Sequence, residues 1–378
     1  MDARAKTERL TELDSLRGLA AVAVLLNHNL LSAGLLQTSL VSALWATPLM
    51  AVVAGRPAVM FFFVLSGFVL ARALARIPGP ITARIWIAWA MQRSIRLMCP
   101  GAAALLISAG LYQVFYRGTW PGEIWWHQSL LWREPPSLRS VLEQALLLRT
   151  IWSFDLDSVL WSLVHEWRIS MILPAIAAVA GLRGPRSAAL LVLIGGAIAG
   201  WTAGRWGADT NLPAGVVASL RSTCYFVLPF TIGIALERLK VGERRVDGLY
   251  LAAGYAAVLG LARMGSDLSD YAASAVLIWA AMHPGPLRTA LRWPVCRWLG
   301  RISFSLYLSH ELVLLPLYHQ LHDRLGGPAL FVLGCALGLV VAHLFFVSIE
   351  RPIHLLARAV WERYGQAGRA APVALAHS

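Results

Sequence analysis

The feature that most constrains the fold of this chain is the repetition of apolar runs about twenty residues long. As an α-helix, a run of this length matches the hydrocarbon core of a bilayer and satisfies its backbone hydrogen bonds internally. We identify ten segments, residues 13–36, 56–76, 97–117, 161–181, 187–205, 216–237, 248–263, 269–283, 299–319 and 328–350. The sequence therefore predicts an all-α integral membrane protein with about ten transmembrane helices.

The composition agrees with this class and argues against nucleic-acid binding. Of the 378 residues, 58% are hydrophobic and 14% are charged, whereas soluble domains carry about 25% charged residues. The formal net charge of +13 comes from Lys and Arg residues that gather in the short links between apolar runs, as topology signals do. We therefore expect a lipid bilayer as partner and no nucleic acid.

The cysteines of the chain indicate neither disulfide bonds nor a metal site. The four cysteines, Cys99, Cys224, Cys296 and Cys335, are widely spaced and form no Cys-x-x-Cys pattern. They therefore indicate neither a metal site nor a disulfide framework, and we expect no bound metal.

The basic residues also predict an orientation. Links rich in Lys and Arg alternate with links that are poor in them, with the long link 118–160 as the exception. By the positive-inside rule, this alternation places both termini in the cytoplasm. The first apolar run lacks a clear cleavage site, so we expect a retained signal anchor. We predict one membrane domain over residues 1–360 and a disordered tail over 361–378.

The link 118–160 does not have the composition of a plain loop. Residues 138–151 are amphipathic and too short to span, and both such helices and tryptophans favour the membrane interface. The tryptophans of the link are Trp120, Trp125, Trp126, Trp132 and Trp152. We predict an interfacial or re-entrant segment between the third and fourth membrane helices. A cap over a cavity and a surface helix without a role in substrate access remain equal alternatives.

The first apolar run carries a polar stripe. On a helix, the eleven steps from Arg17 to His28 make about three turns plus 20°, so both side chains point the same way, about 16 Å apart. Asp14 lies on the same stripe, and Asn27 and Asn29 flank His28. Ionisable groups that face lipid cost several kcal/mol, so the stripe must face protein or a water-filled cavity. We interpret it as a functional site.

Further ionisable residues interrupt other apolar runs. These residues are His165, Glu166, Arg168, His310, Glu311, His343 and Glu350. Histidine is the usual general base near neutral pH, and a neighbouring carboxylate can tune it. A single membrane histidine can equally well hydrogen-bond to a facing helix, but repetition across several runs favours a site. The sequence does not decide whether Glu166 or Glu311 pairs with His28.

An arginine pair precedes the third apolar run. Arg93 and Arg96 are three residues apart and share one helix face. Together with Arg17 they could hold a phosphorylated ligand, because the guanidinium fork matches phosphate geometry. A plain positive-inside cluster explains the same residues. No phosphate-binding loop and no dinucleotide fingerprint is present, so ATP or dinucleotide use has no support.

Five motifs carry a resemblance to a known family. They are LDSLRGLAAVAVLLNH, AVMFFFVLSGFVLAR, WSLVHEWRISMILP, GRISFSLYLSHELV and IERPIHLLAR, in this order. The chain resembles the acyltransferase family 3 membrane O-acyltransferases over about residues 10–360. The resemblance implies about ten membrane helices in the inner membrane and transfer of an acyl group, usually acetyl, from cytoplasmic acyl-CoA. The implied acceptor is a hydroxyl of a glycan, a lipid-linked saccharide or a small natural product.

The resemblance also assigns roles to individual residues. It implies that His28 is catalytic, with Arg17 as its motif partner, and that Arg93 and Arg96 contact the acyl donor. Acyl-CoA is then a donor substrate, and no tightly bound cofactor is expected.

Three further positions match family motifs. Ser66 belongs to the second-run signature, Glu166 to WSL-x-x-E and His310 to SLYL-x-H. The family often has a second acidic residue after WSL, but here Trp167 stands in that place. The complete expected site has His28, Glu166 and His310 as catalytic residues, and Arg17, Asp14, Arg93, Arg96, Asn27 and Ser66 as substrate-binding residues.

Two mechanisms remain open within this class. In direct transfer, His28 deprotonates the acceptor hydroxyl, and Asn27, Asn29 or Ser66 could stabilise the developing oxyanion. In the alternative, an acyl-histidine forms before transfer to the acceptor.

Two other functional classes also remain. A proton-coupled transporter or flippase would use membrane histidines and glutamates as proton relays. The cationic start of the stripe and the lack of paired broken helices argue against it. The second class is a structural membrane subunit, which would keep its function after substitution of His28.

Overall fold

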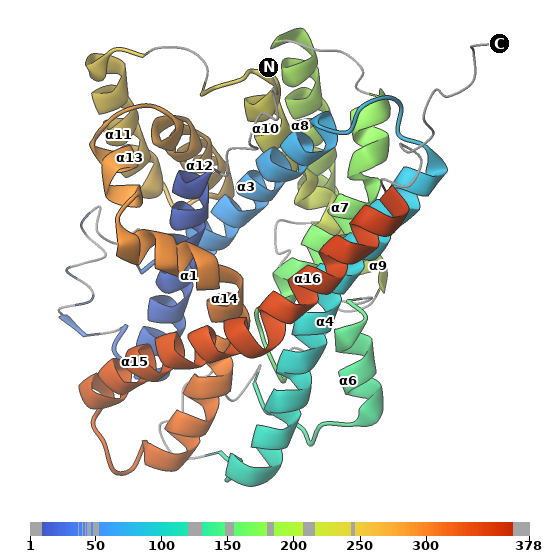
Figure 1. Ribbon diagram of the computed structural model, residues 1–378. Helices are drawn as coiled ribbons and strands as arrows, with labels where there is room; N and C mark the ends of the chain where they lie inside the picture. The colour runs from blue at the N-terminus through green and yellow to red at the C-terminus, as the bar shows by residue number, and fades with distance from the viewer. Residues whose placement is uncertain are drawn as a thin grey trace.

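The computed structural model describes residues 10–36, 53–119, 131–147, 155–179, 185–206, 216–242 and 246–365, together with residues 38, 39, 41, 43 and 47. These residues are mostly helical and contain no strand, which confirms the all-α class (Figure 1). The remaining residues, which include the chain ends and the tryptophans Trp120, Trp125, Trp126 and Trp152, lie outside the described part.

Every predicted apolar segment contains at least one helix. The α-helices are α1 (Thr11–Ser32), α3 (Gly55–Ala75), α4 (Ala83–Phe115), α6 (Leu138–Ala145), α7 (Leu160–Val179), α8 (Pro185–Trp206), α9 (Val216–Tyr225), α10 (Val227–Arg238), α11 (Gly248–Ala262), α12 (Asp267–Met282), α13 (Pro286–Leu291), α14 (Pro294–Leu321), α15 (Gly327–Phe345) and α16 (Arg351–Val360). Two π-helical turns are η2 (Phe346–Glu350) and η3 (Trp361–Gly365).

Five helical stretches of the described residues are long and apolar enough to cross a membrane. They are Gly55–Ala75, Ala83–Phe115, Pro185–Ala203, Val216–Arg238 and Gly327–Gly365. Helices α1, α7 and α14 are also long, with 22, 20 and 28 residues, but they carry the charged and polar residues of the predicted site, which lower their hydropathy. The chain is therefore a multi-pass membrane protein, while ten crossings and the orientation of the termini remain predictions.

Two helix pairs form close contacts through glycine. Helix α1 packs along α14, and α3 packs along α10. A Cβ atom on Gly18 would lie 2.5 Å from the backbone nitrogen of Gly300, and one on Gly67 would overlap the carbonyl oxygen of Phe230. Small residues let backbones approach closely in membranes, where van der Waals packing drives much of helix association. Arg17 and Ser66, which precede two of these glycines, are thereby held at helix contacts.

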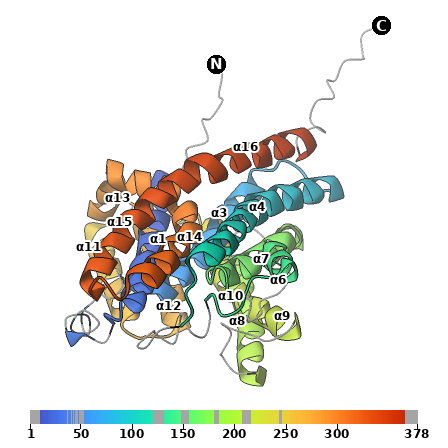
Figure 2. The same cartoon turned by 90° about the horizontal axis from the view of Figure 1, so that it is seen from below.

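The C-terminal helices continue one another. Helices α15 and α16 are joined by the π-helical turn η2, and α16 runs beside α4 in both views (Figure 1, Figure 2). A π-turn inserts an extra residue into a helix and is frequent at functional sites. This turn ends at the buried Glu350, which accepts hydrogen bonds from the backbone nitrogen of Ser305 at 3.0 Å and from its hydroxyl group. The last helical turn ends at Gly365, inside the segment predicted as a tail, and residues 366–378 lie outside the described part.

The link between α4 and α7 contains the expected short helix. Helix α6 has eight residues, and Leu138, Leu142 and the following Leu146 are exposed at four-residue intervals, as on an interfacial helix. Trp132 differs from the expected interface position because its side chain is buried. Its indole nitrogen donates to the hydroxyl oxygen of Ser108 at 3.1 Å, so the polar end of the ring has a partner inside the protein.

The glycine contact between α3 and α10 predicts a stability difference. Gly67→Ala should lower the free energy of unfolding by about 1–3 kcal/mol, because the new methyl group meets backbone that cannot move independently. Gly110→Ala in α4 is the matched control, because nothing lies within 4 Å of its Cβ position. Unfolding of both variants in detergent micelles checks this, and equal stabilities would contradict the close contact.

Candidate active site

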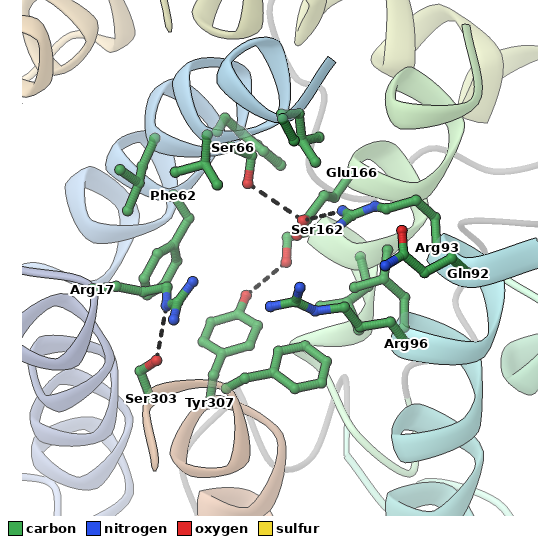
Figure 3. Close-up of a pocket in the computed structure, with 18 of the residues that line it drawn as sticks. Arg17, Phe62, Ser66, Gln92, Arg93, Arg96, Ser162, Glu166, Ser303 and Tyr307 are labelled. Atoms are coloured by element: carbon green, nitrogen blue, oxygen red, sulfur yellow. Dashed lines mark hydrogen bonds and ion pairs between the residues drawn. The ribbon is translucent and has the colours of Figure 1, made fainter. Parts of the chain in front are cut away.

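A cavity of about 220 Å³ lies among α1, α3, α4, α7 and α14 (Figure 3). Its charged lining consists of three arginines and two glutamates, Arg17, Arg93, Arg96, Glu166 and Glu350. Figure 3 shows that Arg17 and Arg96 reach into it from opposite sides. The cavity therefore brings the predicted stripe of α1 together with the predicted arginine pair of α4.

Arg17 is held at the cavity by two neighbours. Its Nη2 atom lies 3.0 Å from Oδ1 of Asp14, and its Nε donates to the hydroxyl oxygen of Ser303 at 2.9 Å. Asp14 itself does not line this cavity. Its contact with the substrate remains a prediction, and its observed contact orients Arg17.

Glu166 connects three of the predicted residues. Its Oε1 atom accepts a hydrogen bond from Nη2 of Arg93 at 2.8 Å and one from the hydroxyl of Ser66 at 3.3 Å. Trp167, at the second acidic position of the family motif, donates from its indole nitrogen to Ser94 of α4 at 3.0 Å. Glu166 thus positions Arg93, and the structure shows no contact between Glu166 and His28.

Arg96 differs from the other two arginines of the cavity. Among the described residues it has neither an ion pair nor a hydrogen bond, although it lines the cavity and is only partly exposed. A guanidinium group is permanently charged and presents several donors in a planar fork. An unpaired guanidinium in such a cavity favours the binding of an anion, phosphate in particular.

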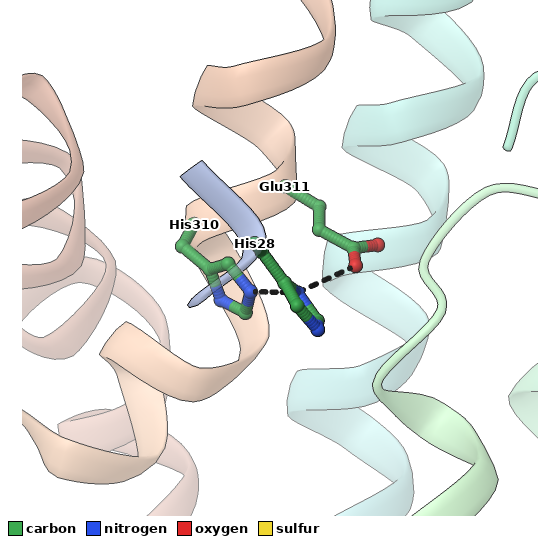
Figure 4. A group of neighbouring side chains, drawn as sticks. All are labelled: His28, His310 and Glu311. Atoms are coloured by element: carbon green, nitrogen blue, oxygen red, sulfur yellow. Dashed lines mark hydrogen bonds and ion pairs between the residues drawn. The ribbon is translucent and has the colours of Figure 1, made fainter. Parts of the chain in front are cut away.

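The second part of the site is a histidine cluster in which His28 lies between His310 and Glu311 (Figure 4). Nδ1 of His28 is 2.9 Å from Nε2 of His310 and 3.3 Å from Oε1 of Glu311. Nδ1 of His310 is 3.0 Å from the carbonyl oxygen of Leu306, so this nitrogen carries the proton and Nε2 of a neutral His310 accepts. The hydrogen bonds therefore assign the proton of neutral His28 to Nδ1 and its lone pair to Nε2.

Glu311 is the carboxylate partner of His28. Its side chain is completely buried, and it accepts hydrogen bonds from the backbone nitrogen of Ser158 at 2.6 Å and from the Ser158 hydroxyl. A buried carboxylate at the N–H side of an imidazole fixes the tautomer and stabilises the imidazolium ion that forms on protonation. The pairing that the sequence left open is therefore made by Glu311.

Other predicted polar residues have structural partners away from the cavity. The amide of Asn27 donates to the carbonyl oxygen of Val53 at 2.9 Å, just before α3, and that of Asn29 donates to the carbonyl oxygen of Phe331 at 2.7 Å. Neither asparagine lines the cavity. Their proposed role toward an oxyanion gains no support from these contacts.

The histidine cluster lies behind one wall of the cavity. None of its three residues lines the cavity, but Tyr307 does, and its ring centroid is 6.4 Å from that of His310. The Tyr307 hydroxyl is 2.8 Å from the hydroxyl of Ser162, and the ring of Phe62 packs edge-on at 5.4 Å. Tyr307 therefore connects the arginine-lined cavity to the histidines, and sequence reasoning did not identify it because a tyrosine in an apolar run resembles an ordinary core residue.

The cluster also has the composition of a metal site, since one ligand atom from each residue lies within 4.8 Å of the others. Two nitrogens bound to a tetrahedral zinc ion would lie roughly 3.3 Å apart, because each Zn–N bond is about 2.0–2.1 Å. The observed nitrogen separation of 2.9 Å is that of a hydrogen bond. The geometry thus favours a hydrogen-bonded cluster.

These features define a class: a multi-pass helical membrane protein with an arginine-lined cavity beside a carboxylate-paired histidine. A family model described as an acyltransferase domain matches residues 10–347, nearly the whole chain. The protein therefore belongs to acyltransferase family 3, which confirms the resemblance seen in its motifs. No curated protein and no solved structure gives a significant match.

The hydrogen-bonded cluster predicts that purified protein holds no stoichiometric metal at His28. Elemental analysis of the wild type and of His28→Gln should give the same substoichiometric zinc, manganese and iron contents. One equivalent of a metal that is lost in His28→Gln would contradict this prediction.

Proposed function

We propose that this acyltransferase is an O-acetyltransferase of the cytoplasmic membrane that uses acetyl-CoA. The proposed acceptor is a hydroxyl of a glycan, a lipid-linked saccharide or a small natural product. The observation that carries the proposal is the arginine-lined cavity next to a histidine held by a buried carboxylate; in this cavity Arg96 has no ion pair or hydrogen bond with the described residues. The first part suits the phosphates of a CoA thioester, and the second suits deprotonation of a hydroxyl.

Acetyl-CoA fits this site because its phosphates and its thioester lie at opposite ends of a long molecule. Its phosphates would be bound by Arg96 together with Arg93 and Arg17, and its pantetheine arm would extend toward His28. Arg17 and His28 lie about 16 Å apart along α1 at the helical rise, a span that the arm can bridge. The thioester must pass the wall formed by Tyr307 and Phe62 to reach the histidine.

The reaction that we propose is direct transfer with His28 as general base. Nε2 of His28 takes the proton of the acceptor hydroxyl, while Nδ1–H stays directed at His310 and Glu311. The hydroxyl oxygen attacks the thioester carbonyl carbon, a C–O bond forms and the C–S bond breaks. The imidazolium then returns its proton to the leaving CoA thiolate, so one ester and one free thiol result.

Removal of the proposed base should abolish most of the activity. His28→Gln should reduce transfer of radiolabelled acetyl groups from acetyl-CoA by about 10²–10⁴-fold, the usual contribution of general-base catalysis. His343→Gln is the matched control, since His343 is an exposed membrane-helix histidine outside the cavity and the cluster. Label transfer by His28→Gln at the wild-type rate would exclude His28 as the base, and a protein that consumes no acetyl-CoA with several acceptors would favour a transporter.

Substitutions in the arginine-lined cavity and in the histidine cluster should change different steady-state constants. Arg96→Ala should raise KM for acetyl-CoA by about 10- to 100-fold with little change in kcat, because a charge-assisted hydrogen bond is worth about 1.5–3 kcal/mol. Arg324→Ala removes an exposed arginine outside the cavity and should leave both constants unchanged.

Glu311→Gln should instead lower kcat, because the imidazolium loses its counter-ion in the transition state. Glu166→Gln is the comparison that separates the two carboxylates: it releases Arg93 and should act mainly on KM. A loss of kcat in Glu166→Gln that equals the loss in Glu311→Gln would contradict the separate roles.

A further inference from the structure

Asp157 is a buried acid next to the histidine cluster that has no role in the proposal above. It lies directly before α7, and its side chain is completely buried. Neither of its carboxyl oxygens makes a hydrogen bond of good geometry with the described residues, and the nearest donor is the backbone N–H of Val159. Both donors of the adjacent Ser158, the backbone N–H and the hydroxyl, are used by Glu311. Asp157 therefore lacks the two hydrogen-bonded donors that stabilise a negative charge on Glu311.

The neighbour of Asp157 is a second carboxyl group, that of Glu311 on α14. Two adjacent carboxyl groups in a buried site do not both ionise, because each charge opposes the other and neither is solvated. Glu311 has the two donors of Ser158 and the nearby ring of His28, so it is the member that holds the charge. Burial, and then the charge of Glu311, raise the pKa of Asp157 well above its ordinary value.

We propose that Asp157 carries a proton and shares it with Glu311, so that the two acids bear a single negative charge beside His28. Asp157 is then a positioning residue that acts on His28 through Glu311. The titratable groups that face it are Glu311 and Tyr307, both from α14, with His28 of α1 beyond Glu311.

The shared proton affects how readily His28 acts as a base. This consequence rests on the proposed function of His28. When the one negative charge is spread over two carboxyl groups, it acts on His28 more weakly than a fully charged Glu311 would. If Glu311 lost the shared proton, its full charge would act on His28 and favour the imidazolium. The pH below which activity falls would then move upward.

Two substitutions that keep the branched shape and the number of heavy atoms of the aspartate side chain separate the effect of the proton from that of packing. Asp157→Asn keeps a donor toward Glu311, whereas Asp157→Leu fills the space without one. In the pH dependence of kcat/KM for acetyl transfer, Asp157→Asn should keep its acid limb and remain within about tenfold of the wild-type rate. Asp157→Leu should move the acid limb up by about one pH unit. An equal shift in both variants, or no shift in Asp157→Leu, would overturn the proposal.

Infrared spectroscopy tests the proton without any assay of transfer. The difference spectrum of the wild type and the folded Asp157→Asn protein at neutral pH should show a carbonyl stretch of a protonated carboxyl group, present only in the wild type. In Glu311→Gln the band should persist at a changed frequency, because its hydrogen-bond acceptor has changed. A missing band, or a band unaffected by Glu311→Gln, would overturn the shared proton. A protein that shows the band but transfers no acyl group would contradict the proposed function alone.

Discussion

The close contact of α1 and α14 is the interaction on which the whole site depends. Because Gly18 and Gly300 bring the two backbones together, residues along the stripe of α1 meet partners on α14. At one end Arg17 donates to Ser303, and three turns away His28 meets His310 and Glu311. A wider spacing between these helices would separate the arginine and the histidine from the partners that orient them.

Charge balance distinguishes the two parts of the site. Asp14 orients Arg17 from outside the cavity, and Glu166 orients Arg93 within it. Arg96 makes no ion pair or hydrogen bond with the described residues, so the cavity has capacity for an anionic ligand. In the cluster the buried carboxylate is already satisfied by Ser158 and directed at the imidazole. The first arrangement suits binding, and the second suits proton transfer. Tyr307 lines the cavity and lies next to the cluster, with its ring centroid 6.4 Å from that of His310.

The sequence alone predicts those features of the fold and of the site that depend on a single helix. The all-α class, the stripe of Arg17 and His28 and the arginine pair of α4 follow from apolar length and helical period. The partner of His28 does not follow, because His28 and Glu311 are far apart in sequence and their meeting depends on how α14 is rotated against α1. A buried aspartate such as Asp157 carries no periodic signal at all, so only the packed structure identifies it.

The most direct test of the account is a structure of the protein with a non-reactive acetyl-CoA analogue bound in the membrane domain. We expect the phosphates of the analogue against Arg96 and its neighbours in the cavity, with the acyl carbonyl beyond Tyr307 and within reach of Nε2 of His28. An analogue whose phosphates lie outside this cavity, or whose acyl group ends away from His28, would contradict the division of the site into a donor cavity and a histidine base.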